Sequence, residues 1–524
     1  MTKRINLKLI EVPTTSLKIN GERLGTDRVR TPIPTQPVLL PSLESGLEKL
    51  GYDVKSEIIN MKLGDSREVH TGTIDLEGLQ LEKYVLGVPF ESIEGSLREA
   101  DVIGLTSNFT YSAGVVSNFI RYARKVNPKL KILVGGADAS TRQNYYLNSG
   151  ADVVIRGEGE NNGPLVIDAL VKGNGLEDIA RVAFKKQDQL IETTGGLGND
   201  PIVMDELPMP SLDKINVSDY IDTGEGPLVE GASPPLWAYE TSRGCMQACH
   251  FCTTPFLKPR FRKMSLERIA KYFEHMKKAG VRTIISNEDN PLSRMHSKGS
   301  QRDPKGREEI LEYAELIKGT DLPFEWANGL EIGKLANEKG EPDTDLIKAL
   351  FYHKKNPYGS FSGTYRCYIP LESLTDEGIA GLKKLRPYEV EKDILRVIAQ
   401  TEVPMLNFGV MVGAPNETPQ SVHKTTERCY EIGKIIKDIS PNTKLYFNFF
   451  MFTPLPGTSD FKRYQDRMVT NINSQPELWS FYASCLDGDH YSAKDITLLR
   501  RKISKEVNGT PAMWVYDGQN DIKK

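Results

Sequence analysis

The stretch Glu240-Thr-Ser-Arg-Gly-Cys245-Met-Gln-Ala-Cys249-His-Phe-Cys252-Thr-Thr-Pro255 holds half of the chain's six cysteines. The other three, Cys367, Cys429 and Cys485, are scattered, and we expect them to be small buried hydrophobic residues. Three thiolates on one short loop suit an iron–sulfur cluster with one iron left without a protein ligand, because a complete site usually takes four cysteines. An open coordination position of this kind is typical of catalytic metals.

A structural zinc site is the alternative interpretation of this loop. His250 would complete a Cys₃His set, but it stands between Cys249 and Cys252, where the short spacing makes simultaneous ligation awkward. No second Cys-x-x-Cys pair elsewhere in the sequence completes a zinc ribbon. We therefore favour the iron–sulfur cluster.

Strand-like and helix-like segments alternate around and after the cysteine loop. The expected strands are 236–241, 281–286, 323–328, 364–371, 405–412 and 445–453, and the expected helices are 265–278, 307–318, 345–352, 390–400 and 420–436. This alternation predicts a partial (β/α)₆ barrel. It places the cysteines after the first strand, on the face where barrel active sites lie.

Residues 1–200 form an earlier alternating series. Strands are expected at 5–12, 53–59, 101–109, 131–135 and 151–156, and helices at 42–50 and 113–125. The series predicts a doubly wound parallel sheet with helices on both faces. Small or polar residues follow three of its strands, namely Thr106, Ser107, Gly135, Gly136, Gly157 and Glu158. We interpret them as a ligand-binding edge, because ligands of parallel sheets bind at the carboxyl ends of strands.

The overall organisation follows from these two alternating series and from the stretch rich in Gly, Pro and Asp between them. We expect a parallel-sheet domain at 1–200, a linker at 201–230, the barrel at 231–460 and a small C-terminal helical extension at 461–524.

A net charge of −3 argues against a large nucleic-acid surface. No apolar run approaches the roughly 18 residues of a membrane span, and no secretory signal is evident. We expect a cytoplasmic protein with neither nucleic acid nor membrane as a partner.

The pattern Cys-x₃-Cys-x₂-Cys, with Phe251 before the last cysteine and Ser242-Arg-Gly244 before the first, resembles the signature of the radical S-adenosylmethionine (SAM) family. The resemblance implies that Cys245, Cys249 and Cys252 hold a [4Fe-4S] cluster. It further implies that SAM chelates the open iron and that the reduced cluster cleaves SAM to a 5′-deoxyadenosyl radical.

Other strand ends are similar to the family's SAM contacts. Asn287, Glu288 and Asp289 occupy the place of the segment that holds the SAM amino group, although the family's glycines are missing. The resemblance also implies SAM contacts from Phe251, Glu372, Ser373, Val412 and Gly413. Residues 452–458 resemble the sixth-strand ending of the cobalamin-associated branch.

The first domain is similar to cobalamin-binding domains fused ahead of such barrels, and the resemblance covers about residues 35–460. It implies cobalamin contacts from the six strand-end residues given above, from Thr106 to Glu158. None of the seven histidines lies in Asp-x-His-x-x-Gly, the motif that supplies an axial ligand to cobalt. Binding without a histidine ligand and loss of the cofactor therefore both stay open. Residues 13–34 also enlarge the first loop relative to the family.

The resemblance implies a cobalamin-dependent radical SAM enzyme, most simply a C-methyltransferase that methylates an unactivated carbon of a small metabolite or peptide. One alternative is radical rearrangement, cyclisation or epimerisation without methylation, and another is a non-catalytic iron–sulfur or cobalamin sensor. The chemistry implies an electron donor such as flavodoxin or ferredoxin. We expect the basic runs 258–263 and 500–502 to be solvated faces.

Overall fold

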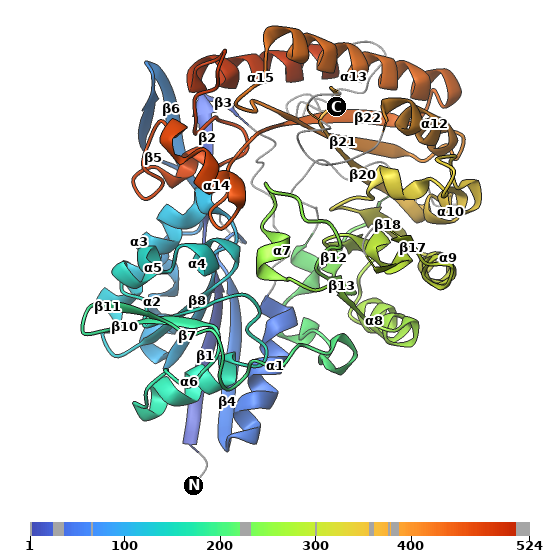
Figure 1. Ribbon diagram of the computed structural model, residues 1–524. Coiled ribbons are helices and arrows are strands. Elements are labelled where there is room, and N and C mark those ends of the chain that lie inside the picture. The colour runs from blue at the N-terminus through green and yellow to red at the C-terminus, as the bar shows by residue number, and fades with distance from the viewer. Residues whose placement is uncertain are drawn as a thin grey trace.

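The computed structural model describes residues 3–24, 36–63, 67–220, 232–298, 301–355, 361–375, 378 and 387–509. Figure 1 shows a blue-to-teal sheet at the lower left, a green-to-orange sheet at the right, and a small antiparallel sheet at the upper left. Within these ranges, no helix is both long and apolar enough to cross a membrane.

The N-terminal sheet confirms the expected doubly wound arrangement. Its order is β11-β10-β9-β8-β7-β1-β4, with β4, β1, β7, β8 and β9 parallel and the β10–β11 hairpin antiparallel at one edge. The strands are β1 (Lys3–Glu11), β4 (Tyr52–Asn60), β7 (Val102–Thr106), β8 (Lys131–Gly135), β9 (Val153–Ile155), β10 (Val182–Lys186) and β11 (Gln189–Glu192). The chain order reverses between β1 and β7, and such a switch point opens a crevice at the carboxyl ends of the strands.

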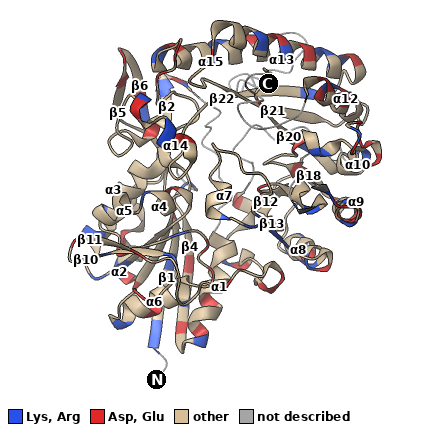
Figure 2. Ribbon diagram, viewed as in Figure 1, with Lys and Arg blue, Asp and Glu red and all other residues tan. Residues whose placement is uncertain are grey.

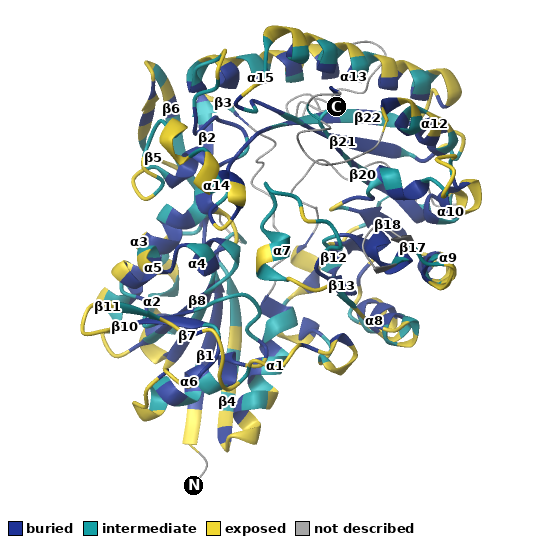
Figure 3. Ribbon diagram, in the orientation of Figure 1, coloured by how far each residue is buried: buried dark blue, intermediate teal, exposed yellow. Residues whose placement is uncertain are grey.

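Helices cover both faces of this sheet. They are α1 (Gln36–Lys49), α2 (Glu94–Glu99), α3 (Ala113–Val126), α4 (Ala137–Thr141), α5 (Gln143–Asn148) and α6 (Gly163–Lys172). Alternate side chains of β1 enter two cores, Leu9 with α1 and α6, and Ile10 with α3. Figure 3 shows the inner strands largely buried and the outward helix faces exposed, and the edge strands β4 and β11 are only partly buried.

Helix α1 begins earlier than expected, because the sequence suggested a start after Pro41. A proline inside a helix costs about 3 kcal/mol and removes one hydrogen bond. Leu40, Leu43 and Leu47 nevertheless form one buried face on the sheet. Their burial offsets the local penalty at Pro41.

An antiparallel sheet interrupts the N-terminal series, which the sequence analysis did not predict. Its order is β3-β2-β6-β5, built from β2 (Thr14–Ile19), β3 (Glu22–Arg23), β5 (Arg67–Leu76) and β6 (Leu79–Gly87). Part of the enlarged first loop is thus strand, and residues 25–34 lie outside the described residues. Glu77 and Gly78 both have positive φ (53° and 81°), as a tight two-residue hairpin turn requires.

The antiparallel sheet packs against the end of the chain. Leu17 and Leu81 share one apolar core with Trp479, whose Nε1 donates to the carbonyl of Pro454 at 2.9 Å. Arg500 of α15 (Ala493–Asn508) donates to the carbonyl of Leu24. The chain end therefore joins the two halves of the molecule. The predicted limits at 200, 230 and 460 remain a proposed division.

The second sheet is the expected partial barrel. Its six parallel strands run in the order β12-β15-β18-β20-β21-β22. They are β12 (Leu236–Tyr239), β15 (Thr283–Ser286), β18 (Pro323–Trp326), β20 (Phe361–Glu372), β21 (Met405–Val412) and β22 (Lys444–Met451). The outer helices are α8 (Leu266–Lys278), α9 (Pro304–Gly319), α10 (Thr344–Leu350), α12 (Tyr388–Ala399) and α13 (Pro419–Ile439).

The scattered cysteines lie in two cores, Cys367 and Cys429 in the barrel and Cys485 in the core around Trp479, and the edge strand of the barrel is covered by a helix. Cys367, Cys429 and Cys485 are fully buried, which confirms them as core residues. At the edge strand β22, the amide of Asn508 donates to the carbonyl of Phe447 and accepts from its N–H, both at 2.9 Å. Helix α15 thereby supplies a side-chain partner where a further strand would pair.

We predict that Trp479→Ala lowers the free energy of unfolding by about 3–5 kcal/mol, because it empties the shared core. Denaturant unfolding followed by circular dichroism measures the change. Leu498→Ala, at a 37% exposed position of α15, is the control and should change little. Equal midpoints for the two variants would contradict the packing described for the chain end.

Candidate active site

A cavity of about 510 Å³ lies between the carboxyl ends of the two parallel sheets. Five of the six residues predicted from the N-terminal strand ends line it: Thr106, Gly135, Gly136, Gly157 and Glu158. Ser107 does not line it, because its buried hydroxyl contacts that of Tyr146 at 2.7 Å. From the barrel side, Asn287 and Asp289 reach the same cavity.

The strand ends leave room for a large group. Gly136 has φ of 102°, and a Cβ there would lie 2.5 Å from the carbonyl oxygen of Ser107. Only glycine fits that close approach of two neighbouring strand ends. A Cβ at Gly135 would meet nothing within 4 Å, so the backbone there borders open space. Leu9, Leu39 and Ile155 supply apolar lining.

The cysteine loop leaves β12 and returns through a two-stranded ribbon. Strand β13 (Ser242–Arg243) pairs antiparallel with β14 (Arg262–Lys263), and the short helix α7 (Thr254–Leu257) lies between them in sequence. Cys245, Cys249 and Cys252 are all half-buried, and the six cysteines, all within the described ranges, form no disulfide. Burial raises the pKa of Cys252.

The loop's histidine faces the chain end. His250 Nδ1 lies 2.5 Å from Asp460 Oδ2, and Ser459 Oγ donates to the carbonyl of His250 at 3.2 Å. Both partners belong to the start of α14 (Ser459–Arg463). The contact ties the cysteine loop to the C-terminal segment.

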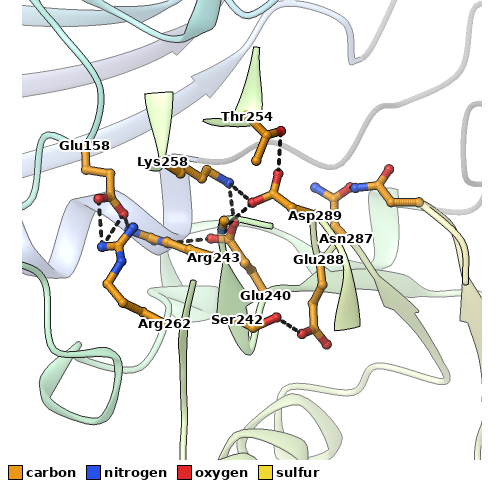
Figure 4. Close-up of polar contacts among 12 residues, drawn as sticks. Glu158, Glu240, Ser242, Arg243, Thr254, Lys258, Arg262, Asn287, Glu288 and Asp289 are labelled. Carbon is orange, nitrogen blue, oxygen red and sulfur yellow. Dashed lines mark hydrogen bonds and ion pairs between the residues drawn. The ribbon is translucent and has the colours of Figure 1, made fainter. Parts of the chain in front are cut away.

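Arg243, two residues before the first cysteine, is surrounded by carboxylates from both domains (Figure 4). Its Nη1 lies 2.9 Å from Glu158 Oε1 and 2.6 Å from Glu160 Oε1. Its Nε lies 2.7 Å from Glu240 Oε2, and its side chain is only 6% exposed. Arg262 also pairs with Glu158, at 2.8 Å. The predicted ligand edge of the first sheet is therefore bound to the cysteine loop by charge.

Lys258 extends this network into the cavity wall. Its Nζ lies 2.8 Å from Glu240 Oε1 and 3.0 Å from Asp289 Oδ2. Burial alone would raise the pKa of Glu240, but Arg243 and Lys258 outweigh it and lower that pKa to about 2. The carboxylate therefore stays charged, with two cations at hydrogen-bonding distance.

The expectation that both basic runs are solvated faces is wrong at several positions. Lys258 and Arg262 bind the carboxylates just described, and in the second run Arg500 is buried while Arg501 pairs with Glu22. Charged residues elsewhere are mixed over the outer helices, as Figure 2 shows. The paired carboxylates lie far away in sequence, so local composition alone could not reveal them.

The segment predicted to hold SAM alternates between the cavity and the interior. Asn287 and Asp289 line the cavity, and Asp289 accepts from the N–H of Gly244 at 2.8 Å. Glu288 points inward, fully buried, and accepts from Ser242 and, at 2.8 Å, from Tyr313. A structural role for Glu288 fits this placement.

The remaining predicted SAM residues do not line the cavity. Phe251 packs on the core of the antiparallel sheet. Val412 is buried in the barrel core, and Gly413 follows it with φ of 84°. Glu372 and Ser373 are half-buried at the end of β20. All of them lie at carboxyl ends of barrel strands or on the cysteine loop, and their contact with SAM stays a prediction.

Sequence analysis missed Glu160, Glu240 and Lys258 as site residues. Glu240 and Arg243 stand three positions apart in the quoted stretch, which was the available signal for their pairing.

Within the described residues, no three His, Cys, Asp or Glu side chains converge as ligands of a single metal ion would. A cubane cluster makes a different demand, since each thiolate binds its own iron atom. Three half-buried thiols on one loop suit that demand.

Comparisons with known proteins agree with this architecture. Residues 75–166 match the model of the B12 binding domain, and residues 239–339 match that of the radical SAM superfamily. The chain joins a B12-binding domain to a radical SAM domain. Domains of these two types bind cobalamin, and SAM with a [4Fe-4S] cluster, respectively.

Two relatives of known sequence and one solved structure are similar to this chain. An uncharacterized methyltransferase of Pyrococcus horikoshii is 22% identical over 77% of this chain and 78% of its own. The hopanoid C-3 methylase of Methylococcus capsulatus is 25% identical over 47% of this chain and 43% of its own. The cobalamin-dependent SAM radical enzyme OxsB, solved with aqua-cobalamin and SAM, has a TM-score of 0.64 at 14% identity. That match covers 96% of this chain and 66% of OxsB, and it concerns the fold.

We predict that Arg243→Met destabilises the protein by about 3–5 kcal/mol, because it leaves carboxylates of both domains without their shared cation. Chemical unfolding of the apoprotein measures this loss. Arg98→Met is the matched control, since Arg98 and Glu94 form an exposed pair worth at most about 1 kcal/mol. Equal losses in the two variants would show that the buried network does not join the domains.

A pH effect is predicted for Glu417, which accepts from the N–H of Gly413. Burial raises its pKa from 4.5 to about 7, although the N–H groups of Gly413 and Ala414 oppose the shift. The folded protein keeps a proton that the unfolded chain releases, so stability should fall as pH rises from about 4.5 to 7 and level off above. Glu417→Gln should lose this part of the pH dependence, measured as the unfolding midpoint across pH. An unchanged profile would contradict the assignment.

Proposed function

We propose that the protein is a cobalamin-dependent radical SAM C-methyltransferase that methylates an unactivated carbon of a small metabolite or peptide. The observation that carries the proposal is the single cavity shared by the two domains. The predicted cobalamin edge forms one wall, and the other consists of strand ends of the radical SAM domain and of loop residues that flank the cysteines, among them Arg243, Thr254 and Lys258. The three cysteines lie on the same loop but are not lining residues themselves. Both cofactors would thus face one substrate space.

The similar proteins support the reaction class. Two of them bear the names methyltransferase and methylase, and the second name specifies a carbon position. When bound, the cluster with SAM supplies the radical that removes a hydrogen atom, and cobalamin supplies the methyl group that replaces it.

The chain's own residues bind and orient these groups. Cys245, Cys249 and Cys252 would each hold one iron through a thiolate. Asn287 and Asp289 present an amide and a carboxylate to the cavity, as groups that accept from the SAM ammonium. Among the described lining residues there is no histidine, so the proposed cobalamin site here uses backbone and polar strand-end groups.

The network around Arg243 keeps the two walls at a fixed separation. Radical transfer demands this, because reacting groups must be held within contact distance and a misplacement of about 1 Å costs on the order of 10²-fold in rate. An electron donor such as flavodoxin or ferredoxin would reduce the cluster, and we include it as part of the proposal.

The test is anaerobic reconstitution of the full chain with iron and sulfide, followed by addition of hydroxocobalamin, SAM and a chemical reductant. We expect 5′-deoxyadenosine and S-adenosylhomocysteine as separate products. The variant with Cys245, Cys249 and Cys252 replaced by Ala should form roughly 100-fold less 5′-deoxyadenosine or lower still, because no cluster remains to cleave SAM.

Cys429→Ala is the matched control, because that thiol is buried in the barrel core away from the loop. It should retain both products. Formation of 5′-deoxyadenosine without S-adenosylhomocysteine would favour rearrangement over methylation. Absence of both products from a fully loaded protein would contradict the enzyme assignment.

A further inference from the structure

Two amide N–H groups point at the sulfur of Cys245. Asn290 Nδ2 lies 3.5 Å from Cys245 Sγ, and the backbone N of Gln247 lies 3.4 Å from the same atom. Asn290 follows β15 and is only 6% exposed. The first cysteine of the loop is therefore contacted by donors from its own loop and from the next strand end.

Glu331 holds both of these residues. Its Oε2 accepts from Asn290 Nδ2 at 2.8 Å, and its Oε1 accepts from Gln247 Nε2 at 3.0 Å. Glu331 lies in the connection after β18, and Lys334 Nζ stands 3.7 Å from its carboxylate. One carboxylate thus spans the cysteine loop and two strand ends of the barrel.

The contacts fix the orientation of the Asn290 amide. Its nitrogen uses one hydrogen for Glu331 and the other for Cys245, and both of these partners are acceptors. A flipped amide would set its oxygen against a carboxylate and a sulfur. In the chosen orientation Oδ1 is buried with no partner among the described residues. The orientation that donates to the sulfur is therefore the one in which both neighbouring acceptors receive a hydrogen.

We propose that Asn290, Gln247 and Glu331 are positioning residues that hold Cys245 and raise the reduction potential of the cluster bound there. The inference rests on the proposed function only in requiring that the loop binds the cluster. A hydrogen bond donated to a cysteine sulfur stabilises the reduced cluster, because reduction adds one negative charge. The Asn290 amide must stay in place to keep its hydrogen bond to Cys245, and the hydrogen bond to Glu331 holds it there.

The experiment is an EPR-monitored redox titration of the reconstituted full chain, without SAM or cobalamin. We expect Asn290→Leu to shift the midpoint to a more negative potential, because one donor is lost. Asn290→Asp should shift it further, since a carboxylate then faces the sulfur. Asn290→Asp keeps the size of the side chain. It therefore tests the role of the donated hydrogen bond even if the leucine variant fails to fold.

Asn118→Asp, at an exposed position on α3, is the matched control for the added charge and should leave the midpoint unchanged. Iron content separates the two proposals. A wild-type chain that holds no iron–sulfur cluster overturns the proposed function. A wild-type chain with its cluster, and Asn290 variants with the same midpoint, overturn this inference alone.

Discussion

The arrangement depends on the charge of Arg243, which is shared among carboxylates of two domains. Glu158 and Glu160 approach it from the B12-binding domain, and Glu240 approaches it from the barrel. A buried arginine without such partners would be costly, as would the carboxylates without it. The same residue begins the loop that carries the cysteines. The same ion pairs of Arg243 therefore join the two domains and fix the start of the cysteine loop.

The loop itself is held from three directions. Arg243 ties its start to the first domain, Asn290 contacts Cys245 from the neighbouring barrel strand end, and His250 meets Asp460 of the C-terminal segment. These partners are far apart in sequence. A loop held in this way keeps its thiols in place before a cluster binds, which reduces the entropy lost on binding.

Much of this architecture could be predicted from the sequence, because the periodicity of β21 and α13 is local and strong. The cysteine spacing likewise identified the loop. What local patterns could not supply were partnerships across the chain. Strands β5 and β6 pack against Trp479, which lies about 400 residues later in the sequence. Lys258 belongs to a basic run, and its pairing with Glu240 and Asp289 depends on the tertiary structure. The alternation that turns Glu288 inward and Asp289 outward also depends on where β15 ends.

The central claim is that cobalamin binds in the cavity shared by the two domains, between the strand ends of the first sheet and the cysteine loop of the second. Hydrogen–deuterium exchange of the reconstituted protein, with and without hydroxocobalamin, tests it most directly. The account predicts slower exchange on cobalamin binding at two places together, at the strand ends around Gly135 and Gly157 and across the interface in the loop from Glu240 to Lys258. Protection confined to the first domain, or found at neither place, would contradict it.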